Sequence, residues 1–184
     1  MMKTEVLTSL YGNQLTEKDN PMIVFRGKLD TLCAMILEAQ VLGEEKKNSE
    51  YVNDLQEILE FIRKLFQAEY KGIEIGDFRL LGITPAEIRE QSHNPQKYFG
   101  RKHLLMHHTM GALSIRLNYL RTVVREVEIA AVAALRDKTT GPLEPSKCLR
   151  QDIVDALNRL SSLFYILIYK YLDKDYSPAG EAGI

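Results

Sequence analysis

The sequence contains no tryptophan and only two cysteines, Cys33 and Cys148, among its 184 residues. Because both are isolated, they can build neither a disulfide framework nor a Cys-based zinc cluster, and we expect unpaired thiols, with Cys33 on a core face. Long apolar runs are missing as well. The most apolar stretch, LFYILIYKYL, is interrupted by Lys170 and is far too short to span a bilayer. These absences exclude a disulfide-stapled scaffold and predict that no segment crosses a membrane.

An excess of charge of one sign is also missing, since 24 Lys and Arg oppose 25 Asp and Glu. No global positive charge is available to neutralise a phosphate backbone or to attract an anionic membrane, so neither nucleic acid nor a membrane is an expected partner. The N-terminus, MMKTEVLTSLYGNQ, has no basic segment leading into an apolar run and no small-residue cleavage site. We therefore expect a cytoplasmic protein, and a chain of this length fits one domain, residues 1–184.

Apolar residues recur at spacings of three and four in several segments, which is the period of one helical face. Gly43 and Gly72 are expected to stop the first two helices, and Thr84-Pro85-Ala86-Glu87 is typical of a helix start with a capping box. Sustained alternation is absent, so the fold class is all-α, an antiparallel bundle of four to five helices. The expected helices are residues 26–42, 51–70, 84–92, 110–135 and 149–172. Residues 1–15 are expected to be loop-like, 71–81 a loop or a brief extended piece, and 173–184 a loose tail.

Three charged residues, Arg121, Arg125 and Glu128, follow one another at i, i+4 and i+7 and therefore lie along one stripe of the fourth long segment. An isolated charged stripe is most often a solvated helix face with an ordinary ion pair. Arg116 and Glu126 fit that ordinary interpretation. The stripe alone leaves both a structural and a functional role open.

Two polar side chains interrupt apolar helices. Asn158 and Ser162 lie one turn apart in the last helix, where an unpaired amide would cost about 1–3 kcal/mol, so Asn158 is either satisfied by a neighbouring helix or reserved for a ligand. Asp30, near the start of the first helix, either interacts with the helix dipole or pairs with an arginine of the fourth helix. His103 and His107 would suit a metal only on a helix, and no acid or cysteine completes the set, so no metal site is predicted.

Two motifs in order resemble the signature of the cobalamin (corrinoid) adenosyltransferase family. Residues 120–128, LRTVVREVE, match an arginine-rich helix of the pattern R-x-x-x-R-x-x-E, and residues 156–162, ALNRLSS, match the L-N-R-L-S helix that follows it. Upstream, KDNP at 18–21 and FRGKLD at 25–30 match the K-x-D/P and G-x-x-D elements of the family. Ser92-His93-Asn94-Pro95 and a serine in place of the usual acid at 162 look most like the ethanolamine-utilisation type. The resemblance extends from about residue 16 to 172.

The resemblance implies an enzyme that moves the 5′-deoxyadenosyl group of ATP onto a reduced corrinoid, by attack of cobalt(I) on the 5′ carbon with the polyphosphate as leaving group. It implies catalytic roles for Arg125, Arg121 and Asp30, the last two as a salt bridge that shapes a site between subunits. It also implies ATP contacts from Lys18, Arg125, Glu128 and Asn158, with Mg²⁺ accompanying the nucleotide. The T-G-D-x-G phosphate motif of other members is not visible, and Thr8 and Ser9 are the candidates for a shortened phosphate loop.

The resemblance further implies a cobalamin contact. Leu104, Leu105 and Met106 lie where the family places an apolar wedge that keeps the lower axial ligand off cobalt. The implied partners are a reductase or another electron donor and two further copies of the chain in a homotrimer, and the implied setting is an ethanolamine-degrading microcompartment. Two alternatives remain open: a corrinoid- or ATP-binding bundle without transferase activity, and a purely structural bundle.

Overall fold

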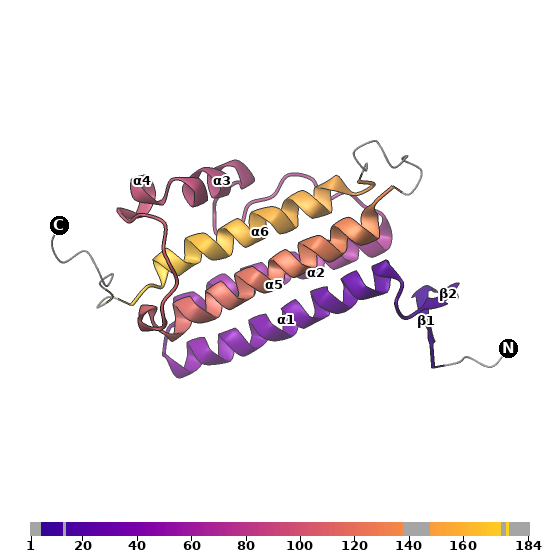
Figure 1. Cartoon of the computed structure of the whole chain (residues 1–184), viewed down its shortest axis with the longest axis horizontal. Coiled ribbons are helices and arrows are strands. Elements are labelled where there is room, and N and C mark those ends of the chain that lie inside the picture. The colour runs from indigo at the N-terminus through magenta and orange to yellow at the C-terminus, as the bar shows by residue number, and fades with distance from the viewer. Residues whose placement is uncertain (1–4, 13, 138–147, 174–175, 177–184) are drawn as a thin grey trace.

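Four long helices lie side by side in the computed structural model of the chain (Figure 1). They are α1 (Pro21–Glu45), α2 (Ser49–Lys71), α5 (Ala112–Leu135) and α6 (Gln151–Lys170). The structure describes residues 5–12, 14–137, 148–173 and 176. A predominantly helical fold is thereby confirmed, and the predicted loose tail, 173–184, lies outside the described residues except at 173 and 176.

Contacts at both ends of the helices show that neighbours run in opposite directions. Lys28 near the start of α1 bonds Glu126 of α5, whereas Glu38 further along α1 bonds Arg116, which lies earlier on α5. The same reversal relates α2 to α6. Lys170 and Tyr171 contact Asp54 at one end, at 2.8 and 2.7 Å, and the Arg150 guanidinium contacts the Ala68 carbonyl at the other, at 3.1 Å. The bundle is therefore antiparallel.

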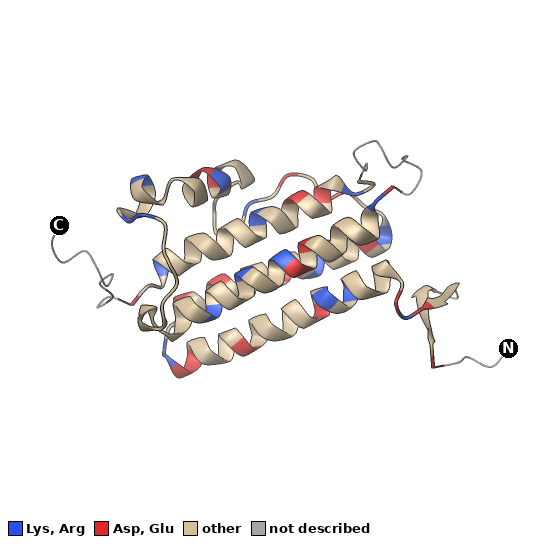
Figure 2. Ribbon diagram, in the orientation of Figure 1, with Lys and Arg blue, Asp and Glu red and all other residues tan. Residues whose placement is uncertain are grey.

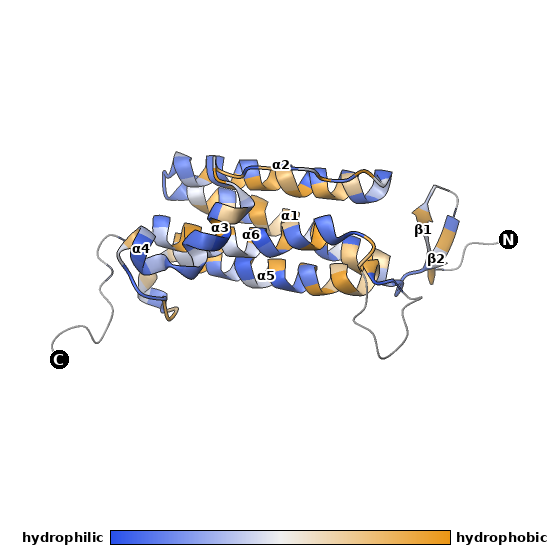
Figure 3. Ribbon diagram, turned by 90° about the horizontal axis from the view of Figure 1, so that it is seen from above, coloured by the Kyte–Doolittle hydropathy of each residue, from blue (hydrophilic) through white to orange (hydrophobic). Residues whose placement is uncertain are grey.

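The four helices bury one continuous apolar core, to which each contributes fully buried side chains such as Phe25, Tyr51, Leu120 and Phe164. Colouring by hydropathy shows apolar and polar residues interspersed along each long helix, as amphipathic helices require (Figure 3). Charged residues of both signs are likewise interspersed over the helices (Figure 2). Among the described residues, no helix is both long and apolar enough to cross a bilayer.

Helix ends follow the sequence signals except at Gly43. Gly72 adopts a φ of 66° and ends α2, and Thr84 and Glu87 form the predicted capping box. Gly43 was expected to end the first helix, but α1 continues to Glu45. A Cβ on Gly43 would lie 2.8 Å from the Tyr51 ring, so this glycine serves close packing of α1 against α2 instead of helix termination.

Two short helices cover α6. Helix α3 (Pro85–His93) lies along α6, and α4 (Pro95–Phe99) follows it at once (Figure 1). The second short helix was not among the expected ones, since the third expected helix ends at residue 92 and Pro95 follows shortly after, although proline is well suited to the first turn of a new helix. Residues 73–84 contain no helix, only a tight turn closed by a bridge between Leu80 and Ile83, and a 3₁₀ turn, η1 (His108–Met110), leads into α5.

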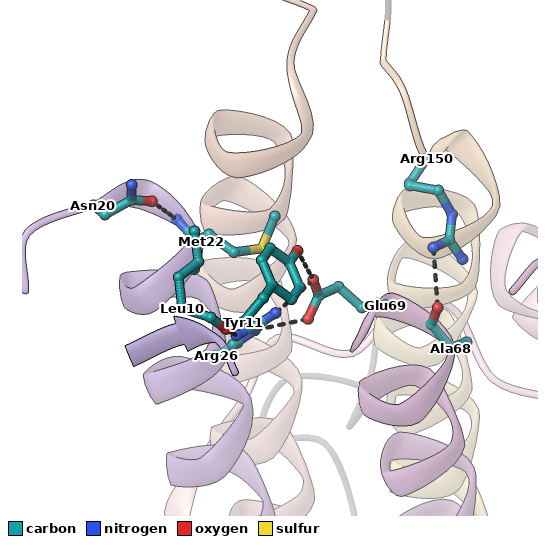
Figure 4. A network of polar contacts seen from close by, with 8 residues as sticks. All are labelled: Leu10, Tyr11, Asn20, Met22, Arg26, Ala68, Glu69 and Arg150. Atoms are coloured by element: carbon teal, nitrogen blue, oxygen red, sulfur yellow. Dashed lines mark hydrogen bonds and ion pairs between the residues drawn. The ribbon is translucent and has the colours of Figure 1, made fainter. Parts of the chain in front are cut away.

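The N-terminal segment, expected to be loop-like, forms a β-hairpin from β1 (Leu7–Tyr11) and β2 (Gln14–Glu17). Arg26 of α1 fixes the hairpin to the bundle, because its Nη1 donates a 2.6 Å hydrogen bond to the Leu10 carbonyl and its Nε bonds Glu69 of α2 (Figure 4). The expectation of a loop was wrong because the two strands are short and half exposed, and their support comes from residues far away in the sequence.

Candidate functional site

A cavity of about 720 Å³ lies between α5, α6 and the end of α3. Helix α5 contributes a stripe that begins at Arg125 and Glu128, and Arg136 follows directly after the end of the helix. Helix α6 contributes Asn158, Arg159 and the serines one turn further on. The lining consists of His93, Arg125, Glu128, Ile129, Val132, Ala133, Arg136, Asn158, Arg159, Ser161 and Ser162. The charged stripe on α5 and the polar break in α6, which the sequence singled out separately, therefore face one space.

A hydrogen bond joins the two helices within this lining. Asn158 Nδ2 donates to Glu128 Oε1 at 2.8 Å, while Asn158 Oδ1 accepts from Arg159 Nη2. The Ser162 hydroxyl bonds the Asn158 carbonyl at 3.3 Å. The two interpretations of Asn158 are thus not exclusive, because its amide is satisfied by a neighbouring helix and also borders the cavity.

The electrostatics of the cavity favour an anion. Arg125, Arg136 and Arg159 line it, opposed by the single carboxylate of Glu128. Burial lowers the pKa of Arg159, and its Nη1 is buried without a hydrogen-bond partner among the described residues. Because a buried N–H lacking an acceptor costs free energy, a ligand that brings anionic oxygens would stabilise this guanidinium.

Arg121 lies one turn before Arg125 but does not line the cavity. Its Nε donates to Asn118 Oδ1 at 3.1 Å, and its pKa is lowered first by burial and second by the charge of Arg125. Asp30 lies on the exposed face of α1, and within the described residues of this chain no ion pair joins it to Arg121. The predicted Asp30–Arg121 salt bridge is therefore not formed inside one chain.

Thr8 and Lys18 belong to the hairpin region and not to the cavity lining formed by the described residues. Thr8 pairs with Thr16 across the two strands. Lys18 is exposed, and its backbone N–H bonds the Val6 carbonyl at 3.0 Å. The structure brings Arg125, Glu128 and Asn158 together, and leaves the two N-terminal candidates elsewhere in the same chain.

Leu104, Leu105 and Met106 lie on an irregular segment that runs from α4 to η1. Leu104 and Met106 are partly buried against the core, whereas Leu105 is 89 % exposed. His103 and His107 are not on a helix, so the i, i+4 spacing that would suit a metal does not arise. Among the described residues, no group of three or more His, Cys, Asp or Glu is placed to hold a metal ion.

Several cavity residues were not selected from the sequence, namely His93, Arg136 and Arg159 among the charged or titratable ones. Arg136 continues the α5 stripe eleven residues after Arg125, a spacing of three helical turns that could have identified it. Arg159 follows Asn158 directly and belongs to the L-N-R-L-S motif, which assigns it no separate role. His93 reaches the cavity because α3 packs on α6, a tertiary contact without a sequence signal.

Comparison with known proteins bears on this cavity. A family model described as cobalamin adenosyltransferase matches residues 5–171. The protein named Corrinoid adenosyltransferase EutT of Escherichia coli (strain K12) is 29% identical over 166 residues, which cover 90% of this chain and 58% of that protein. The protein of the same name from Salmonella typhimurium (strain LT2) is 28% identical over 166 residues. The chain thus spans 58% of the length of these relatives, and the matched region includes both helices that line the cavity.

Proposed function

The chain belongs to the cobalamin adenosyltransferase family, and from that premise we propose that it transfers the 5′-deoxyadenosyl group of ATP to the cobalt of a reduced corrinoid. The observation that carries the proposal is the cavity between α5 and α6. It combines three arginines, a carboxylate bonded to an amide and a buried guanidinium N–H that has no acceptor among the described residues. A nucleotide triphosphate offers the anionic oxygens and the hydroxyl groups that such a lining can bind.

The transfer requires no nucleophile from the protein. Cobalt(I) attacks the 5′ carbon, the carbon–oxygen bond to the polyphosphate breaks, and the polyphosphate leaves with the electron pair. The protein then contributes alignment of the two reactants and stabilisation of the charge on the leaving group. Arg125 suits the second role because a guanidinium can hold phosphate oxygens through two bonds, and Lys18 adds a point charge.

Glu128 and Asn158 are suited to the nucleoside end of ATP. Asn158 occupies Glu128 Oε1 and so orients the carboxylate, which keeps its second oxygen for a ribose hydroxyl. Mg²⁺ would accompany the nucleotide, held mainly by phosphate oxygens and water. The segment of Leu104, Leu105 and Met106 provides the apolar contact with the corrinoid in this proposal, with Leu105 as its exposed side chain.

The active assembly is a homotrimer in which the hairpin of one chain completes the cavity of its neighbour. This arrangement accounts for Thr8 and Lys18, which lie outside the cavity of their own chain, and for Asp30, which would meet Arg121 across the boundary. Exposed apolar side chains on α1 and α5 suit such an interface. They are Val24, Leu37, Val41, Tyr119, Ile129 and Val132.

The cellular setting proposed from the resemblance is the cytoplasm, in association with an ethanolamine-degrading microcompartment. An electron donor, such as a reductase, must supply cobalt(I), because the proposed transfer consumes a reduced corrinoid. Both parts of this proposal follow from the chemistry of the substrate and from the branch of the family that the sequence resembles.

The decisive experiment is an anaerobic assay with chemically reduced cobalamin and ATP, run with and without a divalent metal. Formation of the cobalt–carbon bond changes the visible absorption spectrum, and the proposal requires that change to depend on both protein and ATP. ATP binding without a spectral change would instead identify a binding protein that lacks transfer. No binding of ATP would point to a purely structural bundle.

A further inference from the structure

Two tyrosines of α6 hold the irregular segment that carries Leu105. The Tyr165 hydroxyl lies 2.7 Å from the Tyr169 hydroxyl, 3.0 Å from His103 Nδ1 and 3.4 Å from the Leu104 nitrogen. The Tyr169 hydroxyl lies 3.2 Å from the Lys102 carbonyl oxygen. Three consecutive residues of the segment are therefore bonded to two side chains that stand one helical turn apart.

The number of available protons determines which group donates and which accepts in each hydrogen bond of this network. A carbonyl can only accept, so Tyr169 must donate its single proton to the Lys102 oxygen, and the bond between the two hydroxyls must use the proton of Tyr165. Tyr165 can then only accept from His103, which requires a proton on Nδ1, and from the Leu104 N–H. Burial, followed by the bond with Tyr165, raises the pKa of Tyr169, so this donor stays protonated at neutral pH. Each hydroxyl has one donor role and is satisfied.

The network also selects which side chain faces outward. Leu104 and Met106 turn toward the core, while Leu105 between them is 89 % exposed, as expected for an extended chain whose side chains alternate. Residues 101–107 are all described and form neither helix nor strand, so no backbone ladder fixes their register. A slip of one residue would bury Leu105 and expose its neighbours.

The held segment borders the same face of α6 as the cavity. Asn158, Ser161 and Ser162 line the cavity, and Tyr165 follows one turn later on that face. The charge of Arg121 is close enough to Tyr165 for the two to interact. The segment that carries Leu105 is therefore held by the next turns of the α6 face that lines the cavity.

We propose that Tyr165 and Tyr169 are positioning residues, which hold residues 102–106 in the register that presents Leu105 to the corrinoid and so set corrinoid affinity separately from ATP affinity. The inference rests on the proposed function only for the identity of the ligand. The statement that two tyrosine hydroxyls hold the segment in register depends only on the hydrogen bonds.

Tyr171 provides a matched control. Tyr171→Phe removes the same hydroxyl group as Tyr169→Phe, and both tyrosines are 9 % exposed. The Tyr171 hydroxyl, however, bonds Asp54 of α2 at 2.7 Å and not the segment. Tyr169→Phe should raise the KM for reduced cobalamin about 5- to 10-fold, the equivalent of its one hydrogen bond to the segment, and leave the KM for ATP within about twofold. Hydrogen exchange of residues 101–107 should accelerate in Tyr169→Phe and remain unchanged in Tyr171→Phe.

A second variant tests the register. Leu105→Ala should raise the same KM, and adding Tyr169→Phe to it should raise the KM further by less than about twofold, because both changes remove one contact. Equal effects of Tyr169→Phe and Tyr171→Phe on either KM, or unchanged exchange of residues 101–107, would overturn the proposal. If the wild-type protein binds cob(II)alamin in equilibrium dialysis but transfers nothing, only the proposed function fails. The Kd values of the same variants for cob(II)alamin then test the positioning role of the two tyrosines. If the wild-type protein binds no corrinoid, both fail.

Discussion

Glu69 accepts two hydrogen bonds from the Arg26 guanidinium, at 2.8 Å from Nε and at 2.9 Å from Nη2, and one from the Tyr11 hydroxyl at 2.8 Å (Figure 4). The Arg26 and Glu69 side chains are only 12% and 3% exposed, and Arg26 lies over the rings of Tyr11 and Tyr70. One ion pair therefore joins the hairpin, α1 and α2. The hairpin that carries Thr8 is fixed by a buried charge and not by its own short strands.

Glu69→Gln should lower the free energy of unfolding by about 3 kcal/mol, because it leaves the Arg26 charge buried without a counter-charge. Urea denaturation at a fixed protein concentration measures the change. Glu126→Gln is the control, since it breaks the exposed bridge to Lys28, in which the side chains are 40% and 64% exposed, and should cost less than about 1 kcal/mol. Similar midpoints for the two variants would show that the Arg26–Glu69 pair contributes no more than a surface bridge.

Asp152 should make stability depend on pH in the acid range. Its pKa is lowered mainly by the hydrogen bond from Arg150, so its contribution is fully present above the unfolded-state pKa of about 3.9 and is lost as pH falls through the folded-state value. Asp152→Asn should destabilise the protein by about 1–2 kcal/mol at pH 7, and should flatten the decline in melting temperature as the pH falls below roughly 4, where the carboxyl of the unfolded chain takes up its proton before that of the folded chain. An unchanged acid slope in the variant would contradict this assignment.

Arg125→Ala should reduce adenosyl transfer by at least about 100-fold, the order expected for loss of one charged donor to a leaving group. Arg125 is exposed at the cavity, so helicity and melting temperature should hardly change. Arg116→Ala is the matched control on the same helix, because Arg116 bonds Glu38 of α1 outside the cavity. Equal losses of transfer in both variants would indicate a general effect on α5 and would remove the case for a phosphate contact.

The long helices could be predicted because each keeps an apolar stripe over five or more turns, a local signal that tertiary packing reinforces. Helix α4 could not, since five residues carry no periodicity and Pro95 is compatible with either ending or starting a helix. The hairpin depends on the pairing of Arg26 with Glu69, which is 43 residues away. Such non-local support has no signature in a window of sequence.

The candidate site likewise has features that local sequence patterns predicted and features that they did not. Helical spacing placed Arg125 and Glu128 on one face, and the polar break at Asn158 marked the next helix, so the bond between Glu128 and Asn158 follows from two local patterns that meet. The network of Tyr165 and Tyr169 was not predicted. Both tyrosines lie on the face of α6 that carries Asn158 and Ser162. Their partners are backbone groups and His103 on an irregular segment, whose path no periodicity describes.

The position of Lys18 outside the cavity leads to the last prediction, which concerns the assembly. If ATP is bound by Lys18 of one chain and Arg125 of its neighbour, the protein should sediment as a trimer at micromolar concentration, and each single variant, Lys18→Ala or Arg125→Ala, should be inactive alone. A monomer would exclude a site shared in this way.

Mixed oligomers test the sharing directly. When chains with Lys18→Ala assemble with chains with Arg125→Ala, an interface that takes its lysine from an Arg125→Ala chain and its arginine from a Lys18→Ala chain is complete. In a trimeric ring of heterologous contacts, any trimer that contains both variants has one complete interface among its three, so about a third of wild-type transfer should return in mixed oligomers. The two variants would be co-expressed with different tags, isolated through both tags and assayed anaerobically. Restoration requires that the two residues act from different chains, because a site built within one chain would lack one of them in every subunit. Continued inactivity of verified, folded mixed oligomers would therefore place both residues in the same chain, whereas full activity of Lys18→Ala alone would leave Lys18 as a surface lysine.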